Sequence, residues 1–374
     1  MKLVLLVRSL GMGGAERQLV LLARELSACH AVTVMTFYGG ADHFDASSIG
    51  QAGLVRLDKR GRWDLAGFLR RYLAAVRNAR PDVVYAFMGP ASLVALTSRL
   101  GHARTRVVWG VRSSNVDLAH YGWFARRVRQ LEAGLSRWAD LIVSNSVAGM
   151  AQAQADGFAA SRMIVVGNGI DTQTFQRIPG ARAEVRRALG LPTQARLVGL
   201  LARIDPMKGH EVFLQAAARV ASTMPNVHFV LGGDGPASLV AGLRQQADAL
   251  GIGAIVHWLG RVDDVTRVYS ALDVATSASL FGEGFSNAVG EAMACGIPCV
   301  VTDVGDSARI VGDTGVVVPP GDAGRLAAGM QQLLALPDDE RTAWGECAAA
   351  RIRDHHSVRT MVESTEAALR GLVA

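Results

Sequence analysis

The chain has 374 residues, of which 50% are hydrophobic and 19% are charged, so it can bury the cores of two or three ordinary domains. No run approaches the ~18 uncharged apolar residues that cross a bilayer, and the apolar start lacks a cleavage signal, so we expect a soluble, cytoplasmic protein. The four cysteines are scattered and lack metal-ligand partners, which argues against a disulfide framework and fits a reducing compartment.

Positive charge is concentrated in the first half of the chain. Residues 1–170 carry 21 Lys and Arg against 11 Asp and Glu, a net charge of +10, whereas the remainder has a net charge of −4. This asymmetry favours contact of the first half with something anionic, such as a membrane surface, a phosphorylated acceptor or nucleic acid. The alternative is that the charge serves solubility alone.

Short apolar runs alternate with amphipathic stretches of ten or more residues, as in parallel sheets. In the first half we expect strands at Leu3–Val7, Ala31–Phe37, Asp82–Phe87, Arg106–Val111, Leu141–Ser144 and Met163–Val166. In the second half we expect them at Leu197–Ala202, Val227–Leu231, Ile255–Trp258, Val274–Ser277, Pro298–Thr302 and Gly315–Val318. Because these runs are polar on neither face, they predict doubly wound α/β sheets covered by helices on both sides.

The boundary between the two sets of strands is expected in the polar stretch Thr172–Thr193, which predicts a linker and a short leading helix. The predicted domains are therefore residues 1–175 and 185–355, each built around its own sheet. Residues from about 356 to 374 have helical periodicity but no following strand, and we expect this helix to pack back on the first domain.

A glycine-rich turn follows the first predicted strand and opens a helix. Gly11, Gly13 and Gly14 allow the backbone to approach a phosphate, and the helix amino terminus supplies N–H groups and a favourable dipole. The spacing is not G-x-G-x-x-G, and no acid ends the second strand, so a dehydrogenase is disfavoured. A nucleotide sugar, another nucleotide and simple packing stay open at this point.

Two cations stand at the start of the second domain. Arg203 ends its first predicted strand and Lys208 is expected to open the next helix. Ligands bind at the carboxyl edge of such sheets, where a guanidinium and an ammonium can neutralise a diphosphate leaving group. The sequence contains no visible metal-ligating cluster for that purpose. The alternative is a pair of surface cations near a turn.

Two acids, Glu283 and Glu291, lie eight positions apart around a glycine-bearing turn. A helix is expected to begin near the middle of this segment, with backbone amides pointing into a cleft. We expect Glu283 to accept hydrogen bonds from sugar hydroxyls and Glu291 from a ribose. The alternative is a solvated Glu283 and a helix-capping Glu291. The amides in question are those of Gly284, Phe285, Ser286 and Asn287.

At this segment, and nearly end to end, the sequence resembles the retaining glycosyltransferases of family 4. That family has the GT-B fold, two Rossmann-like domains facing a central cleft, and an E-x7-E signature matched here by Glu283 and Glu291. The other matching segments are Gly13–Glu16, Ala139–Gly149, Val166–Phe175, the pair Arg203 and Lys208, Gly232–Pro236 and Leu259–Val265.

The resemblance assigns a role to each member of the two pairs. It implies that Arg203 and Lys208 hold the donor diphosphate. It implies that Glu291 holds the ribose and that Glu283 touches the transferred sugar. The catalytic set implied in this way is Glu283, Arg203 and Lys208.

The resemblance also extends to the first domain and to the reaction. It implies that Gly13 and Gly14 close over the donor phosphates and that backbone near Arg261 contacts the base. It implies retention of anomeric configuration by front-face attack, with the leaving phosphate helping to take the acceptor proton. Such a reaction uses neither a metal nor a cofactor, only a nucleotide-sugar co-substrate.

One stretch departs from the family pattern. Several members have a histidine near the donor sugar after the fourth strand, whereas this chain has VWGVRSSNVDLAHYGW there. Arg112, Ser113 or Asn115 takes that place on the acceptor side, and His120 is too far along to substitute. The departure favours a UDP-sugar donor and a polysaccharide or lipid-linked acceptor. The alternatives are a GDP-mannose-dependent mannosyltransferase and a UDP-sugar epimerase-like enzyme of the same fold.

Aromatic residues adjoin arginines in two segments of the first half, Arg60–Arg77 and Tyr121–Trp138. This mixture favours peripheral contact with an anionic membrane, here the inner face of the cell membrane. The alternative is buried helices with solvated arginines. No helix-turn-helix, zinc spacing or aromatic sheet signature is present, so a nucleic-acid partner is not expected.

Overall fold

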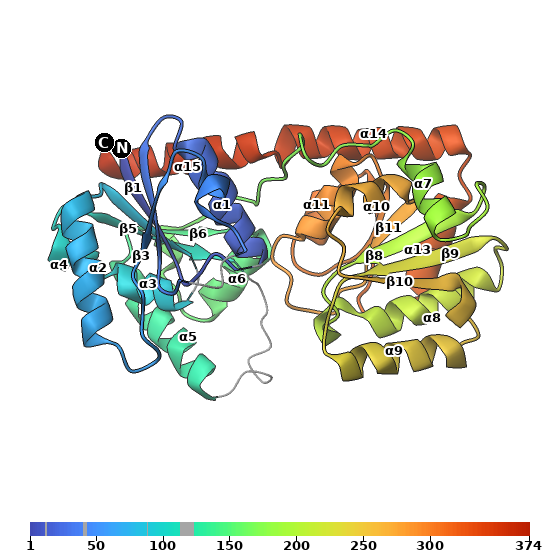
Figure 1. The fold of residues 1–374 in the computed structure, drawn as a ribbon, viewed down its shortest axis with the longest axis horizontal. Coiled ribbons are helices and arrows are strands. Elements are labelled where there is room, and N and C mark those ends of the chain that lie inside the picture. Colours follow the sequence, from blue (N-terminus) through green and yellow to red (C-terminus); the bar gives the residue numbers. More distant parts are fainter. Residues whose placement is uncertain (12, 40–42, 88, 113–122) are drawn as a thin grey trace. The chain divides into compact units, whose positions relative to one another are not determined.

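The computed structural model describes residues 1–11, 13–39, 43–87, 89–112 and 123–374, which form two compact units. Unit 1 comprises Met1–Gly169 with Val358–Ala374, and unit 2 comprises Ile170–Ser357. Figure 1 shows that each unit is a twisted sheet with helices on both faces. Residues 170–175, predicted in the first domain, belong to unit 2.

The sheet of unit 1 is parallel and has the strand order β3-β2-β1-β4-β5-β6-β7. Its strands are β1 (Lys2–Val7), β2 (Ala31–Thr36), β3 (Gly53–Arg56), β4 (Val83–Phe87), β5 (Arg106–Val111), β6 (Leu141–Ser144) and β7 (Met163–Val165). All were predicted except β3. That edge strand is four residues long and none of its residues is buried, so it lacks the apolar run that marks the others.

Helices cover both faces of this sheet and bury its apolar runs. On one face α1 (Gly14–Leu26) packs with the C-terminal helix α15 (Val358–Val373), and on the other α2 (Ala66–Ala79) buries Phe68 and Tyr72. The other helical elements of unit 1 are η1 (Ala46–Ile49), α3 (Gly89–Ala95), α4 (Ser98–Gly101), α5 (Trp123–Leu135), η2 (Ser136–Trp138), α6 (Val147–Ala155) and η3 (Ala160–Arg162).

The sheet of unit 2 is also parallel, with the order β10-β9-β8-β11-β12-β13. Its strands are β8 (Arg196–Leu201), β9 (Val227–Gly232), β10 (Val256–Gly260), β11 (Val274–Ser277), β12 (Cys299–Thr302) and β13 (Gly315–Val318). All six were predicted, because each contains a continuous apolar run, although the edge strands β10 and β13 are only partly buried.

Two hydrophobic cores flank the sheet of unit 2. The first includes α8 (His210–Ala221), α9 (Ala237–Ala249) and α13 (Ala323–Leu334). The second includes α10 (Val265–Ala271), α11 (Asn287–Ala294) and α14 (Asp338–His355). The remaining helical elements of unit 2 are α7 (Ala181–Ala188), η4 (Pro206–Lys208), η5 (Gly253–Ile255) and α12 (Ser307–Val311).

Each sheet reverses its winding direction once. The reversal lies between β1 and β4 in unit 1 and between β8 and β11 in unit 2. Ligands of doubly wound sheets bind in the crevice outside the carboxyl ends of the strands at such a point. A ligand site in unit 2 is therefore expected at the loops after β8 and β11.

Three general features concern chemistry and location. The four cysteines are free, with Cys295 and Cys299 buried and Cys29 and Cys347 exposed. Within the described ranges, no helix combines the length and apolarity needed to cross a membrane. In the same part of the chain, no group of three or more His, Cys, Asp or Glu side chains is placed to hold a metal ion.

Candidate active site

The contact that organises the carboxyl edge of unit 2 joins Lys208, after β8, to Glu283, after β11. Lys208 Nζ donates to Glu283 Oε1 at 2.5 Å, and Ser279 Oγ donates to the same oxygen at 2.6 Å. The Glu283 side chain is only 8% exposed, so the predicted alternative of a solvated Glu283 is wrong. One carboxylate oxygen is thus held by a cation and a hydroxyl; the other has no hydrogen bond to the described residues and could accept one from a ligand hydroxyl.

Backbone hydrogen bonds tie this edge together. Leu280 N donates to Met207 O at 2.7 Å, which joins the β11 loop to the β8 loop. On the other side, Asp306 N donates to Gly284 O at 2.9 Å, which joins the β11 loop to the loop after β12. The segment that carries Glu283 is therefore fixed from both sides before any ligand arrives.

A glycine sets the position of Lys208. Gly209 has a φ of +66°, and a Cβ there would collide with the carbonyl oxygen of Ala278 in the neighbouring loop. Lys208 was predicted to open the next helix. It lies instead in the short 3-10 turn η4, and α8 begins only at His210. The reason is that Asp205 caps η4 and Gly209 ends it before α8 can start.

The other predicted cation of this edge is placed differently. Arg203 follows β8, but its side chain is 68% exposed and pairs with Asp205 in the same loop at 3.1 Å. The structure thus brings Lys208 together with Glu283 and leaves Arg203 at the surface of the loop. Arg261 follows β10, two strands away from β8, and its side chain is 52% exposed and pairs with Asp263 at 3.4 Å.

Helix α11 begins at Asn287, as the sequence predicted. Ser286 is its N-cap residue, but the Ser286 side chain makes no capping hydrogen bond, so it leaves the first N–H groups to other acceptors. Phe285 is buried before the cap and packs edge-on against the ring of His356, with centroids 5.3 Å apart. Glu291 lies one turn inside α11 and is 7% exposed.

In unit 1 the predicted glycine turn lies at the corresponding switch point, after β1. Gly13 is the N-cap residue of α1 and Gly14 its first residue. A Cβ on Gly13 would collide with the carboxylate of Glu16, which folds back over the start of the helix. Helix α1 is also fixed through Gln18. Its side-chain amide donates to Gly169 O at 2.9 Å and accepts from Gly169 N at 2.8 Å.

Arg112 follows β5 at the carboxyl edge of unit 1 and is packed on aromatic rings. Its guanidinium lies over the ring of Phe87 at 4.3 Å and donates to Tyr85 Oη at 2.8 Å and to Asn168 Oδ1 at 3.2 Å. Its Nε is buried without a hydrogen-bond partner among the described residues. The other residues predicted for this stretch lie outside the described residues; they are Ser113, Asn115 and His120.

Three buried polar residues were not predicted as part of these edges. Ser279 supports Glu283, and His210 begins α8 with its pKa lowered to about 4 by burial and by Lys208, so it adds no charge there. Glu132 on α5 lies against Gly89, the first residue of α3, and burial raises its pKa to about 7. No sequence signal marks them, because other polar residues lie near each of them in sequence and the spacing does not single them out.

Two exposed tryptophans lie at opposite ends of the strands of unit 1, Trp63 after a strand and Trp138 before one. Trp63, 81% exposed, is in the loop after β3, with the Arg62 guanidinium 5.1 Å from the centre of its ring. Trp138, 48% exposed, precedes β6, with Arg137 at 4.7 Å. Trp63 and Trp138 are thus exposed beside arginines, whereas Phe68 and Tyr72 of the segment Arg60–Arg77 are buried, as the alternative of a buried helix predicted. The side chains of residues 121–126 lie outside the described part of the chain.

Two family models match the chain in tandem. Residues 12–174 match Glycosyltransferase Family 4, and residues 195–336 match Glycosyl transferases group 1. D-inositol 3-phosphate glycosyltransferases of Mycobacterium bovis and Mycobacterium tuberculosis are each 34% identical over 220 residues, covering 57% of this chain and 44% of theirs. The match therefore spans less than half the length of these relatives.

Solved structures resemble the whole chain. The crystal structure of Anabaena HepE in complex with UDP has a TM-score of 0.85 at 24% identity, covering 99% of this chain and 100% of that one. Sucrose-phosphate synthase from Thermosynechococcus elongatus has a TM-score of 0.84 at 21% identity, covering 100% and 99%. These likenesses and the two parallel sheets confirm the predicted GT-B fold. With both halves matched by family models, the chain belongs to glycosyltransferase family 4.

Proposed function

We propose that this glycosyltransferase transfers a sugar from a UDP-sugar to a glycan or lipid-linked acceptor, with retention of anomeric configuration and without a metal or other cofactor. The observation that carries the proposal is the cluster of Lys208, Glu283 and Ser279 at the switch point of unit 2. It combines a cation for a departing diphosphate with a fixed carboxylate for a sugar.

The cluster favours electrostatic catalysis. Negative charge grows on the diphosphate as the glycosidic bond breaks, and a pre-positioned ammonium such as Lys208 stabilises it without reorganisation. Positive charge grows on the sugar at the same time, and the carboxylate of Glu283 opposes it. Because one oxygen of Glu283 already accepts two hydrogen bonds, this carboxylate suits hydrogen bonding to the sugar better than nucleophilic attack. This supports front-face attack by the acceptor.

The remaining donor roles follow from exposure and position. Arg203, at 68% exposure, is free to leave Asp205 for a diphosphate. Glu291 is a buried acid beside the start of α11 and suits the ribose hydroxyls, while the amino end of α11 suits a phosphate. The backbone at Arg261 is proposed for the base. The roles expected of Gly13, Gly14 and Arg112 belong to unit 1 and stay predictions.

A UDP-sugar is favoured over GDP-mannose on two grounds. The HepE structure contains UDP, and this chain lacks the histidine that several family members have after the fourth strand. A thermal-shift screen of UDP- and GDP-sugars tests the donor, because a ligand that binds only the native state raises the unfolding midpoint. Stabilisation by GDP-mannose alone would overturn the choice of donor.

The reaction itself is tested with the stabilising donor. We expect transfer to an acceptor to continue in excess chelator and the product to keep the donor's anomeric configuration, read by nuclear magnetic resonance. An inverted product would overturn the front-face mechanism, and loss of activity on chelation that a divalent metal restores would overturn metal independence.

The acceptor is proposed to be anionic or carried at an anionic membrane. The Mycobacterium relatives are named for a phosphorylated acceptor, and residues 1–170 of this chain carry a net charge of +10. The loop after β3 adds an exposed tryptophan beside arginine, a pairing suited to the headgroup region of a membrane. We therefore place the protein peripherally on the inner face of the cell membrane.

A further inference from the structure

A cavity of about 440 Å³ lies at the opposite edge of the unit 2 sheet from Lys208 and Glu283. Its wall includes Asp273, which immediately precedes β11, and Ile297, which comes just before β12. Because all strands of this sheet are parallel, their amino ends gather at one edge, while Glu283 follows the carboxyl end of β11. The cavity is therefore separate from the candidate active site.

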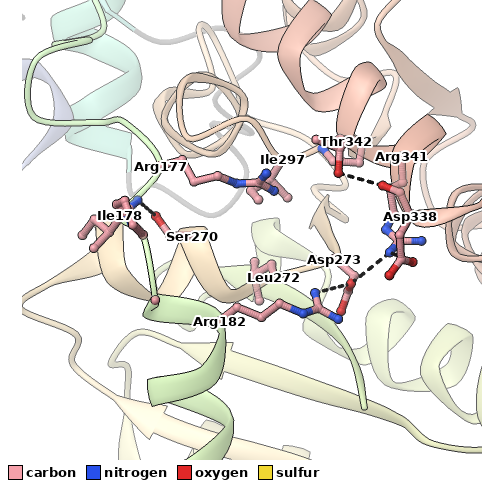
Figure 2. A pocket seen from close by; sticks show the side chains of 13 residues that line it. Arg177, Ile178, Arg182, Ser270, Leu272, Asp273, Ile297, Asp338, Arg341 and Thr342 are labelled. Atoms are coloured by element: carbon pink, nitrogen blue, oxygen red, sulfur yellow. Dashed lines mark hydrogen bonds and ion pairs between the residues drawn. The ribbon is translucent and has the colours of Figure 1, made fainter. Parts of the chain in front are cut away.

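Guanidinium groups border this cavity. Figure 2 shows Arg177 extending along one side and Arg182 along the opposite side, with Arg341 beside Asp273. Arg182 and Arg341 bind Asp273 at 2.6 and 3.4 Å. Arg177 is exposed and, within the described ranges, has neither a hydrogen bond nor an ion pair. One cation at the cavity is thus left for a ligand.

Positive charge exceeds negative charge around the cavity. Four arginines bind Asp273, namely Arg182, Arg186, Arg196 and Arg341. The other carboxylate is Asp338, which pairs with Arg196 at 2.7 Å. Together with Arg177, five guanidinium groups face two carboxylates. Burial lowers the pKa of Arg186 to about 10; Asp273 opposes this shift and the neighbouring arginines add to it.

The remaining wall is apolar with two hydroxyls. Leu272, Ile297 and Pro298 supply the apolar part, and Ser270 and Thr342 supply the hydroxyls. The volume falls within the ~300–1,000 Å³ of small-molecule sites and is larger than a bare phosphate needs. A ligand with a compact body and an anionic group fits both the volume and the charge.

The geometry points to a second ligand site in this cavity, for a small phosphate ester whose phosphate binds Arg177 and whose body lies on Leu272 and Ile297. A phosphate dianion suits an excess of more than one positive charge, and the planar guanidinium fork matches phosphate oxygens. This inference does not depend on the identity of the donor or on the chemistry at Glu283.

The experiment titrates the full chain with glycerol 3-phosphate and, separately, with inorganic phosphate, by calorimetry at constant ionic strength. Three variants are compared with the parent: Arg177→Ala, which removes the unpaired cation; Arg187→Ala, which removes an exposed arginine of α7 outside the cavity; and Lys208→Ala, which disables the opposite edge. We expect Arg177→Ala to weaken glycerol 3-phosphate binding at least tenfold and the other two to bind as the parent does.

Three other results would contradict the proposed phosphate-ester site. Equal affinity of Arg177→Ala and the parent would overturn the site. Loss of binding in Lys208→Ala alone would assign the phosphate to the active-site edge and also overturn it. Equal affinities for glycerol 3-phosphate and inorganic phosphate would overturn the part played by the apolar wall and with it the ester. Failure of nucleotide-sugar binding leaves these comparisons unchanged.

Discussion

Both units bury glutamates at the carboxyl edge of the sheet, and the surroundings of one from each unit differ. Glu283 in unit 2 and Glu132 in unit 1 are both 6% exposed. Glu283 has Lys208 at 2.5 Å and a serine hydroxyl. The arginine closest in sequence to Glu132 is Arg129, which bonds Asp156 at 2.9 Å instead, and burial raises the pKa of Glu132 to about 7.

The difference shows what a hydrogen-bonded cation contributes. A direct ion pair favours the charged form of a buried carboxylate, and burial without one favours the neutral acid. Unit 2 has an ion pair at its edge, an arrangement suited to a polar transition state. Unit 1 has instead a carboxyl group that changes charge near neutral pH.

The largest effect is expected from breaking the charged pair. Lys208→Ala should lower turnover roughly 30- to 1,000-fold, because removing a cation beside the developing diphosphate charge costs ~2–4 kcal/mol of transition-state stabilisation. It should also lower the free energy of unfolding, since Glu283 becomes a buried carboxylate with no ion pair. Steady-state kinetics and urea unfolding measure the two losses separately.

A double variant separates catalysis from stability in this pair. Lys208→Ala combined with Glu283→Gln removes both charges, so we expect the free energy of unfolding to recover while turnover stays low. Recovery of turnover together with stability would show that Lys208 acts only as a partner of Glu283, and the catalytic role would have to be given up.

In contrast to Lys208→Ala, Glu132→Gln should raise the free energy of unfolding, by an amount that grows with pH. In the parent, Glu132 ionises near pH 7 when folded and near its ordinary pKa of 4.5 when unfolded, so stability falls as pH rises between these values. Glutamine does not ionise, so the free energy of unfolding of the variant does not fall in this way. The variant should match the parent near pH 4.5 and exceed it by up to ~3 kcal/mol at pH 8.

The matched control for this prediction is Glu25→Gln, which removes a more exposed acid from α1 of the same unit. Denaturant unfolding of both variants from pH 5 to pH 8 gives the comparison. A pH-independent difference for Glu132→Gln would mean that its carboxyl is already ionised in the fold, and the contrast with Glu283 would disappear.

A smaller effect is expected at the proposed ribose contact. Glu291→Ala should weaken UDP binding by ~1.5–3 kcal/mol, roughly 10- to 150-fold, because hydrogen bonds to a charged group are lost. Glu346→Ala, an exposed acid on α14, is the control and should leave affinity unchanged. Calorimetric titration with UDP measures both. Parent-like affinity of a folded Glu291→Ala would remove Glu291 from the donor site.

Much of the fold could be predicted from the sequence because the strands of a doubly wound sheet are buried on both faces. Strand β3 was not predicted because its sequence, GLVR, has only two consecutive large apolar residues. The polar stretch at Thr172–Thr193 was predicted to contain a linker and a short helix, and the helix is present as α7. Helix α7 carries Arg186, which is only 1% exposed and is bound to Asp273. The burial of this arginine could not be predicted from the sequence, because its acidic partner is 87 positions away.

The same limit applies to the candidate site. Motif spacing identified Lys208 and Glu283, but they are 75 positions apart, and their direct contact depends on two short loops bonded to each other. Ser279 joins them only through that geometry. Residue type and resemblance thus point to the participants, while the pairing within the site requires the three-dimensional structure.

The smallest effect is expected at the proposed membrane contact and concerns the edges of unit 1. Trp63 is exposed after β3, at the carboxyl edge, and Trp138 is exposed before β6, at the amino edge. If the membrane meets the carboxyl edge, Trp63→Ser should weaken binding to vesicles of anionic lipid about 3- to 10-fold, the loss of one interfacial aromatic ring. Trp138→Ser should leave binding unchanged. Vesicle co-sedimentation at fixed salt compares them.

The pair of tryptophans makes this test independent of overall charge. Both stand beside an arginine, Arg62 or Arg137, and neither substitution changes the net charge, so a nonspecific attraction of the basic unit to the vesicle would persist equally in both variants. A selective loss in Trp63→Ser therefore requires an oriented contact through the loop after β3. A selective loss in Trp138→Ser would place the membrane at the amino edge, away from Arg112, and would separate membrane contact from acceptor binding.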